Sequence, residues 1–519
     1  MRPRVLAATA FIILCALAFA GGSGASVGRA SAPGGGNIAP GLEKHAASVP
    51  ADALLNVIVQ GPGARAAAVA HGRSTRSLDF VGGVAAQVRA GQLQRLAHAP
   101  NVSFVAPDAP VELTAGGIST SSLLTLYPGR DSASNPWSAG AVGTGVGIAV
   151  IDSGVTPSTD FGDRLVQVRL DGQDGSLDDT LGHGTMVAGV AAGYSPDGKF
   201  IGLAPGATVY GININRNGGV YSSDVITALK WVFDNAHRYN IRVVNLSLTE
   251  TVKSSYTENP LDLAIERLWA SGVFVSVSAG NSGAGQIDYA PANDPLVFTT
   301  GAFDTMDTAG PGDDRLAPWS SGGRTVDGFN KPDLVAPGRH IGAPLPSGSA
   351  LDNRAPAANR LTPGYATING TSFSAPQTAG AAAIIFGTHP GWSPDNVKWA
   401  LIAKKGASPK DSKVGSLSLS SSYNIAGTPG RANQGVPALV CAPGDTCLSG
   451  GTVASTWDSN SWTSNSWTSN SWSDAGWNSN SWTASADWSS NSWTSNSWTS
   501  NSWTSLSFTT VDPSFDLWG

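Results

Sequence analysis

Three residues of this chain carry the groups that nucleophilic hydrolysis requires, and they occur in the order aspartate, histidine, serine. Asp152 ends the apolar run GIAVI, His183 lies between two glycines in LGHGTMVAGV, and Ser372 lies in NGTSFSAP. A histidine can accept the proton of a serine hydroxyl, and a carboxylate can orient and stabilise the resulting imidazolium. Each residue alone also has an ordinary explanation: a turn for Asp152, a helix start for His183 and a helix N-cap for Ser372. Together they predict a serine hydrolase.

A fourth residue, Asn281, supplies a side-chain amide after the strand-like run VFVSVS and the small residues Ala279 and Gly280. An amide N–H and the backbone N–H of Ser372 are donors of the kind that stabilise the oxyanion formed when a carbonyl is attacked. The alternative for Asn281 is a turn residue before Ser282-Gly283. We therefore include Asn281 in the predicted site as an oxyanion donor.

The elements that must position these residues form an alternating pattern between about residue 123 and residue 406. Apolar runs typical of buried strands alternate there with helical stretches; the runs include VGIAVIDSGV, ATVYGINI, RVVNLSL, VFVSVSAGN and LVFTTGAF. Near-continuous apolar strands separated by helices predict an α/β fold, with a parallel sheet covered on both faces. Sites in such folds form at the carboxyl ends of the strands, which is where Asp152 and Asn281 are expected.

Three blocks of the sequence resemble the catalytic blocks of the subtilisin-like serine proteases: VGIAVIDSGV, GHGTMVAGV and NGTSFSAPQTAG. The order Asp, His, Ser is also that of this family. VNLSL and SVSAGNSG resemble its substrate-binding strand and its oxyanion block, so that the resemblance covers roughly residues 130–406. The resemblance implies a seven-stranded parallel sheet flanked by helices and the hydrolysis of peptide bonds in proteins or peptides.

The resemblance also implies a role for each residue of the site. Ser372 would be the nucleophile, His183 its base, Asp152 the group that orients the imidazole, and Asn281 the oxyanion donor. The residues expected along the bound peptide and at the wall of the specificity pocket are Ser247, Leu248, Thr249, Ala279 and Gly280.

The sequence departs from the family pattern at positions outside the catalytic groups. Met186 and Gln377 stand where the family usually has histidine, and Thr249-Glu250 follow Leu248 where glycine is common. Glu250 leads to the hypothesis of a preference for basic side chains in the substrate. The related Glu-Asp-Ser carboxyl-type peptidases are the rival enzyme class, but they lack the histidine of GHGT, and His183 argues against them.

Residues 1–32 are predicted to be a secretory signal peptide. Arg2 and Arg4 precede an apolar run from Val5 to Ala20, and small residues follow. This is the usual pattern of a cleaved signal, and sixteen apolar residues are short for a membrane span. The chain is therefore expected to be secreted and extracellular.

A linker at 33–49 and a small module at 50–122 follow the predicted signal. The module has the order β-α-β-β-α-β of a ferredoxin-like α+β unit. One strand is expected in LLNVIVQ, two in SLDFVGGVAAQV that meet near Gly82-Gly83, and a last one in VSFVAPDAPVEL. It resembles the inhibitory propeptide of the same family, which blocks the cleft of its own enzyme until it is cut away. The resemblance places self-processing after about 111–122 and implies that the propeptide is an intramolecular partner.

The C-terminal part is predicted to comprise a linker at 407–450 and a tryptophan-rich repeat tail at 451–519. Because the chain is exported, Cys441 and Cys447 in CAPGDTC are predicted to form a disulfide. From Trp457 to Trp503 a tryptophan recurs about every fifth residue. A low-complexity spacer, a solenoid and a flexible ladder of aromatic faces that binds glycans or cell wall are the three interpretations. The last supports an alternative function, a cell-surface or glycan-binding protein with secondary protease activity.

Composition limits the partners and cofactors of the chain. Its 519 residues have a net charge of −6 and contain no marked basic patch, which argues against nucleic acid as a partner. No cofactor is required for the predicted chemistry. Family members often bind calcium, and an acidic loop before His183 has oxygen ligands that suit it, but a solvated loop is the alternative and no metal ligand is assigned. The loop contains Asp171, Asp174, Asp178 and Asp179.

Overall fold

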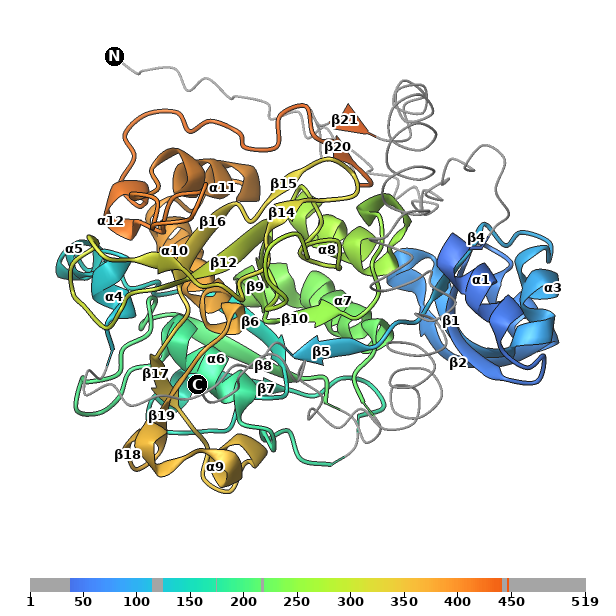
Figure 1. Cartoon of the computed structure of the whole chain (residues 1–519), viewed down its shortest axis with the longest axis horizontal. Helices are drawn as coiled ribbons and strands as arrows, with labels where there is room; N and C mark the ends of the chain where they lie inside the picture. Colours follow the sequence, from blue (N-terminus) through green and yellow to red (C-terminus); the bar gives the residue numbers. More distant parts are fainter. Residues whose placement is uncertain (1–37, 114–124, 174, 216–218, 441–445, 448–519) are drawn as a thin grey trace, which may run out of the picture.

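The computed structural model describes residues 38–113, 125–173, 175–215, 219–440 and 446–447 (Figure 1). The predicted signal peptide and the tryptophan-rich tail lie outside these residues, as does Cys441 of the predicted disulfide with Cys447. Within them a small N-terminal domain precedes a large α/β domain, and Figure 1 shows the two side by side. No helix in these ranges combines the length and apolar character needed to cross a membrane.

The small domain is a four-stranded antiparallel sheet with the strand order β2-β3-β1-β4. The predicted β-α-β-β-α-β order is present. Its elements are β1 (Leu54–Gln60), α2 (Ala64–His71), β2 (Gly72–Leu78), β3 (Gly83–Arg89), α3 (Leu93–Ala97) and β4 (Phe104–Pro107), with the short 3-10 helices η1 (Asp79–Val81) and η2 (Ala90–Gln92). Val57 and Val59 of β1 are completely buried and share a core with Ala68 of α2 and Leu96 of α3. Alternation along β1 and the apolar faces of the two helices thus build this domain.

Three predicted boundaries of the small domain differ from the structure. The strand predicted to end near Gly82 in SLDFVGG lies earlier, because β2 ends at Leu78 and Asp79–Val81 form η1. The range 33–49, predicted to be a linker, contains helix α1 (Pro40–Ser48), whose Leu42 is buried in the core of the small domain. Pro40 begins this helix at a position where its missing N–H costs nothing. The single strand predicted in VSFVAPDAPVEL is divided into β4 and β5 (Val111–Leu113). Pro110 lies between them and cannot donate to a ladder.

The large domain is built on seven parallel strands, as predicted. Their order across the sheet is β7-β8-β6-β9-β11-β12-β16, and β13 adds an antiparallel edge to β12. The parallel strands are β6 (Gly147–Asp152), β7 (Leu165–Val168), β8 (Thr208–Asn213), β9 (Ile241–Leu246), β11 (Phe274–Ser278), β12 (Phe298–Asp304) and β16 (Leu334–Pro337). All residues of β6, β11, β12 and β16 are buried, as expected of strands in a parallel sheet that is covered on both faces.

Four helices flank this sheet. Helix α6 (His183–Ala192) packs against α10 (Ala375–Thr388), and α7 (Ser222–Tyr239) packs against α8 (Pro260–Ala270). The second pair lies on the side that faces the small domain (Figure 1). Helix α6 is buried throughout, and a Cβ added at Gly380 of α10 would lie 2.8 Å from the carbonyl oxygen of Ala191. Small residues therefore let α10 lie close against α6.

The range 407–450, predicted to be a linker, packs on the large domain as far as residue 440. Leu417, Leu419 and Ala438 are buried, and α12 (Leu419–Ser422) contacts α11 (Pro394–Ala403). The prediction missed this packing because the stretch is rich in serine and glycine and contains few apolar residues. The remaining elements of the large domain are α4 (Tyr127–Arg130), α5 (Ser134–Ser138), η3 (Gly162–Arg164), β10 (Leu248–Glu250), η4 (Tyr256–Glu258), β13 (Arg315–Leu316), β14 (Gly323–Arg324), β15 (Asn330–Lys331), β17 (Ile341–Pro344), α9 (Ala350–Arg354), η5 (Ala357–Asn359), β18 (Arg360–Thr362), β19 (Tyr365–Ile368), η6 (Thr371–Phe373), β20 (Pro437–Ala438) and β21 (Thr446–Cys447).

Candidate active site

Asp152 and His183 are in direct contact at the edge of the central sheet. Asp152 is the last residue of β6 and His183 the first residue of α6. Nδ1 of His183 donates to Oδ1 of Asp152 at 2.8 Å, and both side chains are completely buried. This contact fixes the ring orientation and leaves the proton-accepting role to Nε2.

Glycine makes this approach possible. A Cβ added at Gly184 would lie 2.2 Å from the carbonyl oxygen of Gly154, which is too close for any side chain. The start of α6 therefore rests directly on the turn that follows β6. The second glycine of the GHG sequence is thus explained by the packing of the histidine against its aspartate.

Asp179 holds the start of α6 in place, a role that sequence reasoning missed. Its Oδ1 accepts from Ser153 Oγ and Gly182 N at 2.7 Å each, and its Oδ2 accepts from Thr185 N at 2.7 Å and Thr185 Oγ1 at 2.8 Å. Burial, and to a lesser degree the charge of Asp152, raise the pKa of Asp179. An aspartate shortly before a helix start is a capping signal that could have identified it.

The structure describes three of the four aspartates of the acidic loop considered from the sequence as a calcium site. Asp179 accepts four hydrogen bonds from protein groups, whereas Asp171 and Asp178 are exposed. Asp174 lies outside the described residues. Among the residues that the structure describes, no group of three or more His, Cys, Asp or Glu side chains is placed to hold a metal ion.

Ser372 lies in η6, a single 3-10 turn between β19 and α10, and is completely buried. This turn contacts both α6, which begins with His183, and β11, which leads to Asn281. Ser247 fixes it from a third side, because its Oγ donates to the carbonyl oxygen of Ser372 at 2.7 Å. The aromatic rings of Phe373 and His183 form a T-shaped contact, with centroids 5.4 Å apart. The predicted nucleophile and base are therefore on adjoining elements.

Asn281 is held by the residue that precedes the nucleophile. Its Oδ1 accepts from Thr371 N at 3.0 Å and from Thr371 Oγ1 at 2.9 Å, and Gly280 N donates to the same hydroxyl at 3.1 Å. With Oδ1 occupied in this way, the Nδ2 group of the amide is turned away from Thr371. Thr371 was not predicted from the sequence, since a threonine beside a serine carries no distinctive signal.

The predicted substrate-binding strand is paired in this structure with the end of the small domain. Strand β10 pairs antiparallel with β5, with Leu248 opposite Leu113 and Thr249 opposite Glu112. On the other side, Ser222 at the start of α7 donates to the carbonyl oxygen of Ala109, through N and through Oγ, at 3.0 Å each. An extended segment that enters from the small domain is thus held between β10 and α7, as Figure 1 shows for β5.

Glu250 does not offer its carboxylate to the cleft in this arrangement, contrary to the hypothesis of a preference for basic side chains. It is buried, with Oε1 2.5 Å from Ser222 Oγ and Oε2 accepting from Asn259 Nδ2 at 2.7 Å. Burial raises its pKa to about 7. The side chain joins β10 to the start of α7 beneath the segment that lies between them.

The contacts between the two domains include two further acids. Asp108 of the small domain accepts from Ser223 N at 3.0 Å and Ser223 Oγ at 2.8 Å, and burial raises its pKa to about 6. Arg76 of the small domain pairs with Asp224 at 2.9 Å. The first turn of α7 therefore receives both a carboxylate and a guanidinium from the small domain.

An aspartate–histidine pair at the carboxyl edge of a parallel sheet, next to a serine turn and a fixed side-chain amide, defines a serine hydrolase of the Asp-His-Ser type. Residues 143–428 match the Subtilase family, which is more than half of the chain, and the chain belongs to this family of serine proteases.

Known members of the family are similar to the chain over part of their length. Serine protease AprX of Bacillus subtilis is 35% identical over 270 residues, which is 49% of this chain and 60% of AprX. Subtilisin E of Bacillus subtilis is 27% identical over 63% of this chain and 76% of its own length. The crystal structure of fervidolysin from Fervidobacterium pennivorans, a keratinolytic enzyme related to subtilisin, has a TM-score of 0.54 at 22% identity, covering 71% of this chain and 61% of fervidolysin. The last likeness concerns the fold alone.

Proposed function

We propose that this chain is a secreted serine endopeptidase that is made as a self-processing zymogen. The observation that carries the proposal is the Asp152–His183 hydrogen bond at the turn that bears Ser372. In this mechanism Nε2 of His183 takes the proton of Ser372 Oγ as that oxygen attacks the peptide carbonyl. The same proton then passes to the leaving amine, and a water molecule attacks the acyl-enzyme with His183 again as the base.

Asn281 and the backbone N–H of Ser372 are the donors to the oxyanion in this proposal. Because Thr371 occupies Oδ1 of Asn281, the amide is fixed before substrate arrives. Donors that need no reorganisation stabilise the developing charge most effectively. The nucleophile, the base and the oxyanion donors all belong to the chain, and the proposed reaction requires no cofactor.

The substrates in this proposal are extended protein or peptide segments. The pairing of β5 with β10 supports this, because it uses backbone hydrogen bonds that any extended chain can make. Ser247, Leu248 and Thr249 would line one side of the bound peptide. Ala279 and Gly280 would form part of the wall next to the oxyanion donor.

The small domain would act as an intramolecular inhibitor that is removed by the enzyme itself. Strand β5 lies along the predicted substrate-binding strand, and Ser222 and Ser223 bind Ala109 and Asp108 just before it. A substrate cannot occupy β10 at the same time. Self-processing is proposed after about 111–122, which would leave the small domain as a separate chain.

Secretion, structural calcium and surface attachment remain proposals that rest on the sequence. The signal pattern at residues 1–32 supports export. The second candidate function, attachment to glycans or cell wall through the tryptophan repeat, is favoured by the recurrence of tryptophan between Trp457 and Trp503. A chain that ends at residue 450 separates the two functions: the proposal expects unchanged cleavage of casein and loss of adhesion to cells or glycans.

The central experiment compares the wild-type chain with Ser372→Ala and His183→Ala. We expect casein cleavage near neutral pH only for the wild type, together with loss of the small domain from the wild type alone. Ser421→Ala, an exposed serine far from the site in sequence, is the matched control and should leave both activities intact. Self-removal of the small domain by Ser372→Ala, or activity confined to strong acid, would overturn the proposal.

A further inference from the structure

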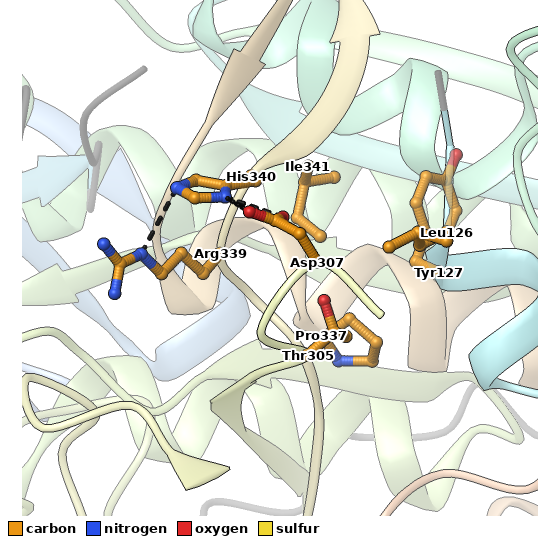
Figure 2. A pocket seen from close by; sticks show the side chains of 8 residues that line it. All are labelled: Leu126, Tyr127, Thr305, Asp307, Pro337, Arg339, His340 and Ile341. Carbon is orange, nitrogen blue, oxygen red and sulfur yellow. Dashed lines mark hydrogen bonds and ion pairs between the residues drawn. The ribbon is translucent and has the colours of Figure 1, made fainter. Parts of the chain in front are cut away.

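A second histidine–aspartate pair, His340 and Asp307, lies next to the segment that leads to Ser372. Nδ1 of His340 donates to both carboxylate oxygens of Asp307, at 2.8 Å each. Nε2 of His340 accepts from Nε of Arg339 at 3.3 Å, and Arg339 also pairs with Asp304 at 2.9 Å. Figure 2 shows the two contacts of the His340 ring on one side of a small pocket, with Tyr127 opposite.

Both members of this pair have a strained backbone. The φ angles are 54° for His340 and 57° for Asp307, and Met306 beside Asp307 has a φ of 53°. Non-glycine residues rarely adopt this left-handed conformation, and they retain it only where other contacts enforce it. The hydrogen bond between His340 and Asp307 is such a contact, because it joins the two strained turns to each other.

His340 lies at the bend between strand β16 of the central sheet and strand β17 of the small β17-β19-β18 sheet. Strand β16 of the central sheet ends at Pro337, and β17 begins at Ile341 and pairs with β19. The last pair of that ladder is Ile341 with Ile368, so His340 stands opposite Asn369, the next residue toward Ser372. A left-handed corner at His340 thus sets the angle between β16 and β17.

The segment 336–340, which we call the brace, is hydrogen-bonded to residues 369–377, which include Ser372. His340 N donates to Asn369 Oδ1 at 2.8 Å, and Gly370 N donates to Gly338 O at 2.8 Å. Beyond Ser372, Ser374 Oγ donates to Pro337 O at 3.1 Å and Gln377 Nε2 donates to the same oxygen at 2.7 Å. The brace is therefore hydrogen-bonded to residues on both sides of the nucleophile.

We propose that His340, held by Asp307, is a positioning residue for Ser372. The hydrogen bond to Asp307 keeps the backbone of His340 in the left-handed conformation. In this conformation the brace binds Asn369 and Gly370, and these two residues fix the turn that presents the Ser372 hydroxyl. Neither His340 nor Asp307 touches the substrate. The inference rests on the proposed protease function and adds to it a determinant of turnover outside the triad.

The experiment uses His340→Ala, Asp307→Ala, the double variant and His340→Asn in the full chain. Asparagine adopts the left-handed conformation readily and retains a side-chain N–H for Asp307. We expect His340→Ala and Asp307→Ala each to lower kcat on a small peptide substrate about tenfold with KM within about twofold, as expected of misplaced catalytic groups. The double variant should be no worse than either single variant, and His340→Asn should restore kcat to within about threefold.

Unfolding midpoints of the same variants in the Ser372→Ala background separate positioning from folding. Arg360→Ala, which breaks an exposed ion pair with Asp352, is the matched control and should leave kcat unchanged.

The proposal fails if kcat of His340→Ala stays within twofold of wild type. It also fails if the loss of kcat follows a lower unfolding midpoint and His340→Asn does not rescue it. If His340→Ala does not fold, Asp307→Ala and His340→Asn carry the same comparison. An inactive wild type would instead refute the protease function itself.

Discussion

The side-chain oxygen of Asn281 accepts two hydrogen bonds from Thr371, at 3.0 Å from the backbone nitrogen and at 2.9 Å from the hydroxyl. Thr371 is the immediate neighbour of Ser372, so the oxyanion donor and the nucleophile share one support. The amide can therefore not rotate without breaking contacts to the same turn that carries the nucleophile. This relationship makes the oxyanion donor part of the rigid site rather than of a free loop.

Removal of this donor should lower turnover without preventing folding. For Asn281→Ala we expect kcat to fall about a hundred- to a thousand-fold, the usual loss for one oxyanion donor, with little change in KM. Steady-state kinetics on a peptide substrate measures both constants. A raised KM with an unchanged kcat would show that Asn281 binds the ground state instead.

Thr371→Val tests the support separately from the donor. Valine retains the backbone bond to Asn281 but loses the hydroxyl, which donates to Asn281 and accepts from Gly280 N. We expect a loss in kcat of about tenfold, since the amide would remain present but less well placed. Thr371→Ser retains the hydroxyl and is the control; the role assigned to the hydroxyl is wrong if both variants behave alike.

Much of the fold and most of the site could be predicted, because they depend on local patterns. The seven parallel strands follow from apolar runs separated by helices, and Asp152 and Asn281 are placed at the sheet edge because each ends such a run. What the sequence did not reveal depends on contacts between distant residues. Asp179 was assigned to an acidic loop because nothing local shows that Ser153 and Thr185 bind its carboxylate.

The remaining differences have the same cause. Strand β5 was predicted as the continuation of β4, since a sequence pattern shows strand character but not the partner of a strand. The role of His340 also depends on Asp307 and Asn369, which lie 33 and 29 residues away along the chain. A glutamate beside the substrate strand suggested specificity from the sequence, whereas Ser222 and Asn259 occupy the Glu250 carboxylate in the structure.

Asp152→Asn should remove most of the activity while leaving the fold in place. Asparagine has the same shape, but it stabilises neither the required tautomer of His183 nor the imidazolium formed during the reaction. We expect kcat to fall by about ten-thousand-fold near neutral pH, the magnitude typical of this substitution in Asp-His-Ser enzymes. A circular dichroism spectrum identical to that of wild type is the control for folding, and a loss below tenfold would contradict the assigned role.

Release of the small domain should become easier as pH rises. Burial raises the pKa of Asp108 to about 6 and that of Glu250 to about 7, from ordinary values of 3.8 and 4.5. Because both carboxyls lie at the contact between the domains, the docked state favours their protonated forms. This stabilisation is complete below the ordinary values and is lost as pH rises through about 6 to 7.

The measurement is the rate at which protease activity appears in wild type and in the double variant Asp108→Asn/Glu250→Gln between pH 5 and pH 8. Burial also lowers the pKa of His45 to about 3, which favours unfolding of the small domain in acid. The comparison of the two proteins removes this contribution, because His45 is present in both. We expect a smaller rise in release rate with pH in the double variant, and parallel pH profiles would refute the role of the two acids.

Asp262 should destabilise the protein at alkaline pH, because its carboxyl group is buried with no hydrogen-bond partner for either oxygen in the part of the chain that the structure describes. Burial, together with the nearby charges of Asp294, Glu250 and Glu266, raises its pKa well above 3.8. The folded state thus favours the protonated form. Its contribution to stability is complete below pH 3.8 and is lost as pH rises through the folded pKa.

Asp262→Asn removes the cost of ionising a buried carboxyl group and should raise the free energy of unfolding at pH 8 by about 1–3 kcal/mol, with little effect near pH 3.5. Unfolding midpoints in the Ser372→Ala background, which prevents self-digestion, measure the difference, and the exposed Asp163→Asn is the matched control. A midpoint at pH 8 that stays equal to wild type or falls would show that Asp262 is satisfied as an anion.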